Sequence, residues 1–77
     1  MIRIILFAGL RDRIGRAELE APFQSIDISS LLTWVESQYP AVTFDHVMVA
    51  INEQWSNKQS VAKQGDTVAL LPPVSGG

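Results

Sequence analysis

The segment Ile2-Arg3-Ile4-Ile5-Leu6-Phe7-Ala8 determines much of the architecture expected for this chain. It is rich in β-branched and large apolar residues, which favour a strand. Alternation places its even-numbered residues on one face and Arg3, Ile5 and Phe7 on the other. Both faces of this strand are therefore largely apolar.

The residues that follow predict a turn back and a second strand. Gly9 and Gly15 bracket a stretch long enough for one helical turn or a loop. Residues 17–23 then alternate between apolar side chains and Glu18 and Glu20, which is typical of a half-buried strand. Pro22 indicates that this strand lies at a sheet edge or ends there, because proline cannot donate to a ladder.

One helix is expected, over residues 30–39. Apolar side chains recur there at helical spacing, from Leu31 to Tyr39. Ser29 or Ser30 can cap the helix by accepting a hydrogen bond from a free backbone amide, and Pro40 would stop it.

Three further strands are expected over residues 47–51, at Trp55 and over residues 67–71, whereas residues 56–62 are weakly patterned. The order strand, strand, helix, strand, strand, strand predicts a single α+β domain over residues 1–77, with a sheet covered by one main helix on one face. Alternation then places Ile5, Phe7 and Leu71 on the uncovered face, with Trp55 as a candidate fourth member. Contiguous exposed apolar side chains usually mark a partner surface.

Composition excludes several classes of function. The 77 residues include no cysteine, which rules out disulfides, thiolate metal sites and thiol nucleophiles. A formal net charge of −2 provides no basic surface for nucleic acid. No apolar run approaches the roughly 18 to 20 residues that cross a bilayer, so we expect no membrane partner and a cytoplasmic protein. The Asp45-His46 pair and the scattered carboxylates suggest no metal site.

The end of the sequence is its most informative feature. Pro72 and Pro73 terminate the last strand and favour an extended exit, and Val74 and Ser75 lead to Gly76-Gly77. Residues 72–77 are therefore expected to form a flexible tail. A terminal Gly-Gly presents an α-carboxylate with no side chain beside it, so it could enter a narrow channel in another protein. The alternative is an ordinary frayed end.

Three segments carry a resemblance to a known family: residues 4–15, residues 49–52 and residues 65–77, which end in Pro-Pro-Val-Ser-Gly-Gly. They resemble the small, sulfur-carrying subunits of molybdopterin synthase. These are ubiquitin-like β-grasp proteins, a group that includes the thiamin sulfur carrier. The resemblance covers the whole chain and implies a β-grasp fold with a mixed sheet.

The resemblance also implies a function for the carboxylate of Gly77. A separate adenylating enzyme, related to ubiquitin-activating enzymes, would use ATP and magnesium to adenylate it. Sulfur would then displace AMP and leave a thiocarboxylate. The thiocarboxylate would donate sulfur to cyclic pyranopterin monophosphate within a heterotetramer of two small and two large subunits.

In such an assembly the catalytic residues belong to the large subunit, so this chain would not be an enzyme on its own and would bind no cofactor. The family's partner surface corresponds to Phe7, Trp55 and Leu71, and its loop arginine corresponds to Arg11. Two alternatives stay open. One is a sulfur carrier for another, thiamin-type pathway, and the other is a ubiquitin-like interaction module or protein modifier.

Overall fold

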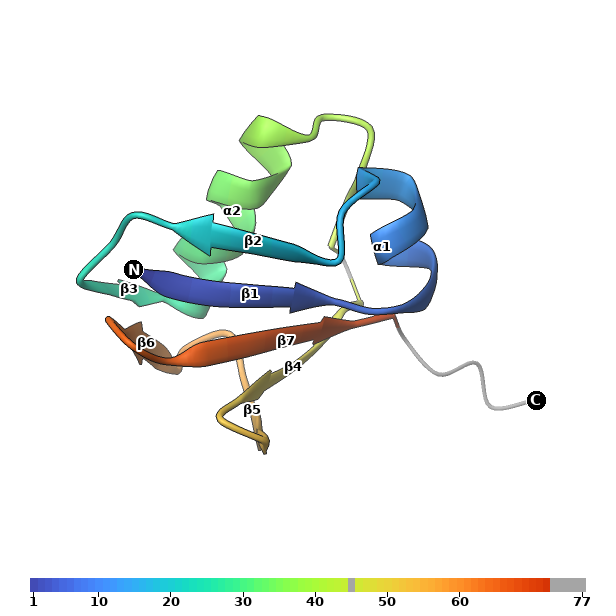
Figure 1. Cartoon of the computed structure of the whole chain (residues 1–77). Helices are drawn as coiled ribbons and strands as arrows, with labels where there is room; N and C mark the ends of the chain where they lie inside the picture. The colour runs from blue at the N-terminus through green and yellow to red at the C-terminus, as the bar shows by residue number, and fades with distance from the viewer. Residues whose placement is uncertain (45, 73–77) are drawn as a thin grey trace.

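A computed structural model describes residues 1–44 and 46–72, and within them a mixed sheet carries two helices on one face (Figure 1). The first and last strands lie side by side at the centre of this sheet. The elements in chain order are β1 (Ile2–Leu6), α1 (Ala8–Ile14), β2 (Glu18–Ala21), β3 (Ser25–Asp27), α2 (Ile28–Gln38), β4 (Met48–Ile51), β5 (Gln54–Ser56), β6 (Val61–Lys63) and β7 (Thr67–Leu71).

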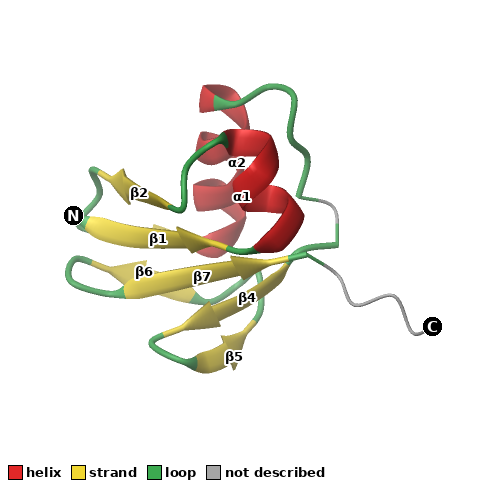
Figure 2. Ribbon diagram, turned by 45° about the vertical axis from the view of Figure 1, so that its right-hand side comes forward, coloured by secondary structure: helices red, strands yellow, loops and turns green. Residues whose placement is uncertain are grey.

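The five-stranded sheet has the strand order β2-β1-β7-β4-β5. Strands β1 and β7 are parallel, and the other neighbouring pairs are antiparallel. Strands β3 and β6 form a separate two-stranded sheet. Both helices lie on one side of the large sheet and leave the other side open (Figure 2). This arrangement confirms the expected α+β, β-grasp fold with one main helix on one face.

The hydrophobic core lies between the sheet and α2, and the alternation of β1 determines which side chains enter it. Ile2, Ile4 and Leu6 are buried, as the even-numbered face predicts. The core cluster continues through Leu19 of β2, Val68 and Leu70 of β7 and four residues of α2: Ile28, Leu31, Leu32 and Val35. One continuous hydrophobic core therefore joins these elements.

Helix α2 begins earlier than expected, and the predicted serine cap was wrong. Its cap is Asp27, whose carboxylate accepts a hydrogen bond of 2.9 Å from the backbone amide of Ser30. The Ser30 hydroxyl donates to the same carboxylate at 2.8 Å. These two hydrogen bonds lower the pKa of Asp27 below its usual value, and the bond from the Ser30 backbone amide is the larger cause. Ile28 is fully buried, so the first turn is also held by the core.

The sequence left the first helix open between a helical turn and a loop, and it did not predict the strands β3 and β6. The stretch between Gly9 and Gly15 is part of a seven-residue helix, α1, in which Leu10 and Ile14 are buried one turn apart. Gly15 ends this helix in the left-handed region, at φ 81°. Strand β6 begins at Val61 in the weakly patterned residues 56–62, extends to Lys63 and pairs with β3. Each of these strands has only three residues, too few for alternation to reveal.

The β4–β5 hairpin turns at Asn52 and Glu53, which have positive φ angles of 51° and 69°. The Asn52 side chain ties this turn to the start of β7: its oxygen accepts from the Thr67 amide at 3.0 Å, and its amide donates to Asp66 at 3.0 Å. Asp66 also accepts from the Lys63 amide at 2.8 Å. The Lys63 amide first, and Asn52 second, lower the pKa of Asp66 below its usual value. No helix within the described residues is long and apolar enough to span a membrane.

Candidate functional site

The uncovered face of the sheet is organised in rows of side chains that run across the strands. The strand registers place Glu18, Ile5, Ala69, Ala50 and Trp55 in one such row, from β2 to β5. On one side of it, Glu20, Arg3 and Thr67 form a polar row. On the other side, Leu71 lies opposite Met48, beside the Phe7 position that follows β1. The face therefore changes from charged to apolar toward the end of β7.

The apolar part of this face, which we call the open-face patch, comprises Ile5, Phe7, Met48, Ala50, Trp55, Ala69 and Leu71. Two aromatic side chains stand on it, since Phe7 is 42% exposed and Trp55 is 66% exposed. Ala50 pairs with Ala69 in the part of the patch between the two aromatic side chains. Because alanine side chains are short, the middle of the patch is low. A low floor between exposed aromatic residues is a shape that fits a partner's apolar side chains.

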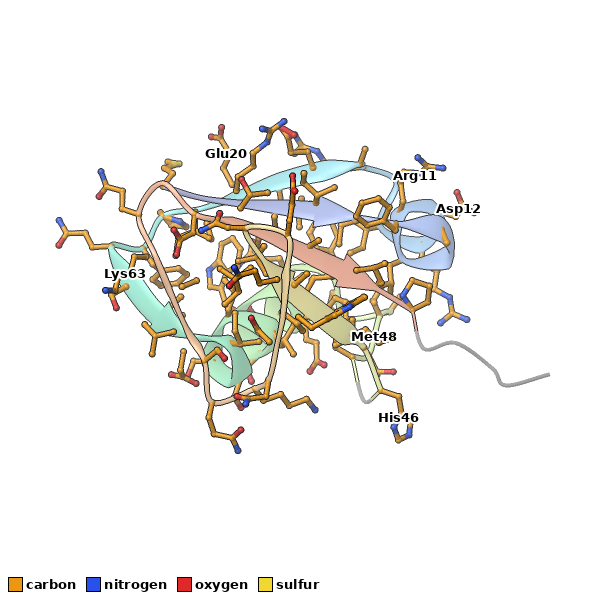
Figure 3. The ribbon with its side chains drawn as sticks, turned by 90° about the horizontal axis from the view of Figure 1, so that it is seen from below. Arg11, Asp12, Glu20, His46, Met48 and Lys63 are labelled. Atoms are coloured by element: carbon orange, nitrogen blue, oxygen red, sulfur yellow. The ribbon has the colours of Figure 1, made fainter. Side chains whose placement is uncertain are left out.

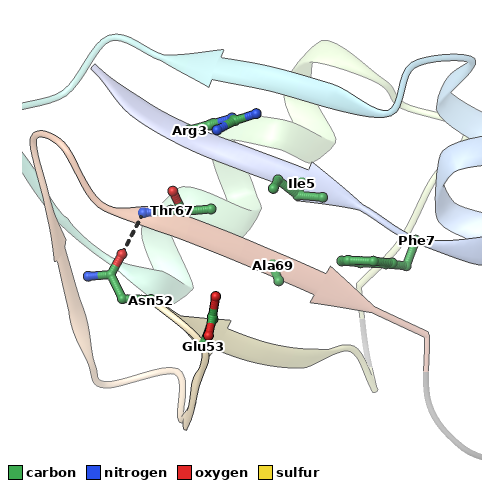
Figure 4. Close-up of a pocket in the computed structure, with 7 residues that line it drawn as sticks. All are labelled: Arg3, Ile5, Phe7, Asn52, Glu53, Thr67 and Ala69. Carbon is green, nitrogen blue, oxygen red and sulfur yellow. Dashed lines mark hydrogen bonds between the residues drawn. The ribbon is translucent and has the colours of Figure 1, made fainter.

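Beside the patch is a hollow of about 500 Å³ (Figure 4). Phe7, Ile5 and Ala69 line its apolar end. Arg3, Thr67 and the turn residues Asn52 and Glu53 line its polar end. The hydrogen bond from the Thr67 amide to Asn52 fixes the wall of the hollow between β7 and the hairpin.

One of the charges at the polar end, that of Arg3, is compensated within the chain. The Arg3 Nε donates to Glu18 at 2.7 Å, and the same two side chains form an ion pair. The hydrogen bond and then the negative charge of Glu18 raise the pKa of Arg3 above its usual value. Because both side chains are exposed, this pair adds little stability.

The tail leaves the fold at the apolar end of this face. Leu71 belongs to the open-face patch, and the next residue, Pro72, lines a second hollow of about 260 Å³ with Gly9, Leu10, Arg13 and Thr43. Residues 73–77 lie outside the described part of the chain, so the expectations for Pro73, Val74, Ser75, Gly76 and Gly77, and for a flexible tail, stay predictions. The patch and the root of the tail are direct neighbours.

The structure brings together three of the four residues assigned to partner binding. Phe7 and Leu71 share the open face, as alternation predicted, and the register of β4 with β5 and β7 adds the candidate Trp55. Arg11 lies in α1 rather than in a loop, and its side chain is exposed (Figure 3). The basic side chain beside Pro72 is that of Arg13. A role for Arg11 in partner contact stays a prediction.

Sequence reasoning missed the floor of the patch. Met48, Ala50 and Ala69 join it through the registers of β4 with β5 and β7. Alternation along residues 67–71 carried the signal for Ala69, because it places Ala69 on the face of Leu71. Met48 and Ala50 could be assigned to that face only from the register of β4 with β7.

The described residues contain no cluster of potential metal ligands. No group of three or more His, Asp or Glu side chains in residues 1–44 and 46–72 could hold a metal ion. His46 is exposed and points outward (Figure 3).

Comparison with known proteins gives a consistent result. A family model described as ThiS family matches residues 4–77. The molybdopterin synthase sulfur carrier subunit of Haemophilus influenzae is 31% identical, over 100% of both chains. The subunit of the same name from Dictyostelium discoideum is 27% identical, over 97% of this chain and 94% of that one.

Solved structures show the same fold. SAMP1 from Haloferax volcanii has a TM-score of 0.80 and 25% identity, and the match covers 99% of this chain and 98% of that one. A second match is to a chain of the molybdopterin-converting factor from Helicobacter pylori, in a structure of the complex of its subunits 1 and 2. This match has a TM-score of 0.57 and 22% identity, and it covers 99% of this chain and 97% of that one.

Proposed function

The chain belongs to the ThiS family, and on that premise we propose that it is a sulfur carrier of molybdenum cofactor biosynthesis. Its relatives from Haemophilus influenzae and Dictyostelium discoideum bear the name of that subunit, and the match covers nearly all of each chain.

One observation supports this function most directly: the open-face patch and the root of the tail lie at the same end of the sheet. Leu71 is in the patch and Pro72 is the next residue. A partner that covers Phe7 and Leu71 is therefore placed to receive residues 73–77. Four residues beyond the two prolines reach about 13 Å at most, which is enough to enter a neighbouring active site.

The proposed chemistry takes place on the carboxylate of Gly77. A carboxylate is a poor electrophile, so an adenylating enzyme first joins it to the α-phosphate of magnesium-bound ATP and releases pyrophosphate. Sulfide (HS⁻) then attacks the carbonyl carbon, AMP leaves, and loss of the remaining S–H proton gives the thiocarboxylate. The resulting thiocarboxylate needs no cysteine of this chain, in agreement with the absence of cysteine from the sequence.

Sulfur transfer requires a second partner, for which we propose the large subunit of molybdopterin synthase. The Helicobacter pylori protein of the same fold is found in a complex with the second subunit of its converting factor. In our proposal two small and two large subunits form a heterotetramer. The large subunit supplies the catalytic residues and binds cyclic pyranopterin monophosphate, which accepts the sulfur, and the Gly77 carboxylate is regenerated.

The test is the intact mass of the chain after incubation with ATP, magnesium, a cognate adenylating enzyme and a sulfur source. We expect a mass gain equal to the exchange of one oxygen for sulfur, and no gain in a variant that lacks Gly77. A thiocarboxylate on the full chain that does not convert cyclic pyranopterin monophosphate, even with the large subunit, would support the thiamin-type alternative. No mass gain with an active enzyme would contradict the carrier function.

A protein modifier is the second candidate, because SAMP1, whose structure this chain matches, belongs to the small archaeal modifier proteins. A modifier would join its Gly77 carbonyl to a lysine amine of a target and release the activating group. Lysine-linked peptides ending in the Gly-Gly of this chain, found by mass spectrometry after protease digestion, would favour this function.

A further inference from the structure

The outer edge of β2 offers backbone groups that the sheet does not use. β2 is the last strand on its side of the sheet. The Leu6 amide donates to the Ala17 carbonyl at 2.9 Å, so alternation directs the backbone groups of Leu19 and Ala21 toward β1 as well. The amides and carbonyls of Glu18 and Glu20 therefore point away from the sheet. Pro22 ends this stretch, since it has no amide to donate.

A hollow of about 300 Å³ runs between this edge and the second half of α2. It is lined by Met1, Arg16, Leu19, Glu20, Pro22, Trp34, Gln38 and Tyr39. The Trp34 ring packs edge-on against Phe23, with centroids 5.6 Å apart and planes at 85°, which fixes one wall. In Figures 1 and 2, α2 extends past β2, so it stands over the edge without occupying it.

Two charges of opposite sign flank the hollow. Glu20 projects outward from the edge of β2 (Figure 3). Arg16 is exposed at the opposite end. Within residues 1–44 and 46–72 the ion pair found is that of Arg3 with Glu18, so neither Glu20 nor Arg16 is held in an ion pair there. Glu20 lies opposite Arg3 in the register and shares in its charge field, whereas its carboxylate stays exposed to a partner.

We propose that the outer edge of β2 is a second docking surface, which takes an extended segment of another polypeptide as an added antiparallel strand. The ladder would form with the backbone of Glu18 and Glu20. The charges determine the register: position 1 of the segment is basic and lies opposite Glu20, and position 5 is acidic and lies opposite Arg16. Positions 2 and 4 are apolar, because they share the face of Leu19 and turn into the hollow.

A second copy of this chain is the competing occupant. Residues 16–20, Arg-Ala-Glu-Leu-Glu, have a basic residue at one end and an acidic residue at the other, so they match the same pattern. In a two-fold pair, however, the α2 of each copy would project past the shared edge and over the sheet of the other copy (Figure 1). That face of the other copy is already covered by its own α1 and α2, so the helices would collide. A single extended segment meets no such obstacle.

The proposed surface is separate from the open-face patch. The patch extends from β1 to β5, whereas this edge lies on the far side of β1. Occupancy of one surface therefore leaves the other available, and the proposal does not depend on the sulfur-carrier function.

The test is an NMR titration of the isotopically labelled chain with the capped peptide Thr-Lys-Leu-Thr-Leu-Glu-Thr, in which Lys is position 1 and Glu is position 5. We expect shift changes over residues 16–21 and at Trp34 and Tyr39, and slower hydrogen exchange of the Glu18 and Glu20 amides. N-methylation at position 3, whose amide faces β2, should abolish binding. N-methylation at position 2, whose amide faces away, should preserve it.

Charge reversal tests the register. Glu20→Lys should weaken binding about fivefold, as expected when an exposed attraction becomes a repulsion. A peptide with Glu at position 1 should restore the affinity. The matched control is Glu53→Lys, the same charge change in the β4–β5 turn, which should leave binding unchanged.

Three results would overturn the proposal. Shift changes confined to the open-face patch would place the peptide there instead. Equal effects of the two methylated peptides would exclude strand addition. Sedimentation of the free chain as a dimer that Glu20→Lys dissociates would assign the edge to a second copy.

Discussion

Replacing Trp55 should weaken binding of the large subunit more than replacing Phe7, and the structure gives the size of the difference. Large aromatic side chains bury about 150 to 250 Å². With 66% of Trp55 and 42% of Phe7 exposed, a partner that covers both removes about 165 Å² and about 85 Å² from water. At about 25 cal/mol per Å², Trp55→Ala should cost about 4 kcal/mol and Phe7→Ala about 2 kcal/mol of binding.

These free energies correspond to a rise in Kd of about a thousandfold for Trp55→Ala and about thirtyfold for Phe7→Ala. Isothermal titration calorimetry against the purified large subunit measures both. The matched control is Val61→Ala, because Val61 is a large apolar side chain, 48% exposed, that lies in β6 outside the five-stranded sheet. A Trp55→Ala chain that is folded and binds within threefold of the original would refute the assignment of the open-face patch, as would an equal loss with Val61→Ala.

Three more predictions follow from the core, the hairpin and the tail. Leu70→Ala, at a fully buried position of β7, should lower the free energy of unfolding by about 2 to 5 kcal/mol in urea denaturation, whereas a loss below about 1 kcal/mol would contradict the placement of the core. Asp66→Asn should lower the free energy of unfolding at pH 7, because the folded state lowers the pKa of Asp66 below its unfolded value of about 3.9. The difference in free energy of unfolding between the variant and the original chain should shrink as the pH falls below about 4. A difference that stays constant down to about pH 2 would contradict this. One alanine added after Gly77 should abolish thiocarboxylate formation in the mass assay with no change in Tm, and a sulfurated product would show that the Gly77 carboxylate is not the carrier.

The parts of the fold that could be predicted from sequence are those with enough apolar residues to show a period. Strands β1 and β7 and helix α2 each carry such a pattern, and all three were expected close to their observed bounds. Helix α1 has only Leu10 and Ile14 to reveal its face, and the flanking glycines favour a loop equally well. The cap of α2 was misassigned because Asp27, Ser29 and Ser30 are all good cap residues, and only the buried Ile28 decides among them.

The candidate site was predictable in part for the same reason. Alternation along a single strand identified Ile5, Phe7 and Leu71, since it needs no knowledge of the neighbouring strands. The floor of the patch depends on register, which is a tertiary property. Ala50 and Ala69 are unremarkable until the pairing of β4 with β7 places them side by side beneath the two aromatic residues.

The parallel pairing of β1 with β7 has a consequence for folding kinetics. Arg3 pairs with Thr67 and Leu6 with Leu70, so the middle of the sheet forms only when the two ends of the described chain meet. Such long-range pairing raises contact order and slows folding relative to a helical protein of similar length. A chain cut before β7 loses the centre of its sheet. Every molecule that folds therefore carries the strand from which the tail emerges.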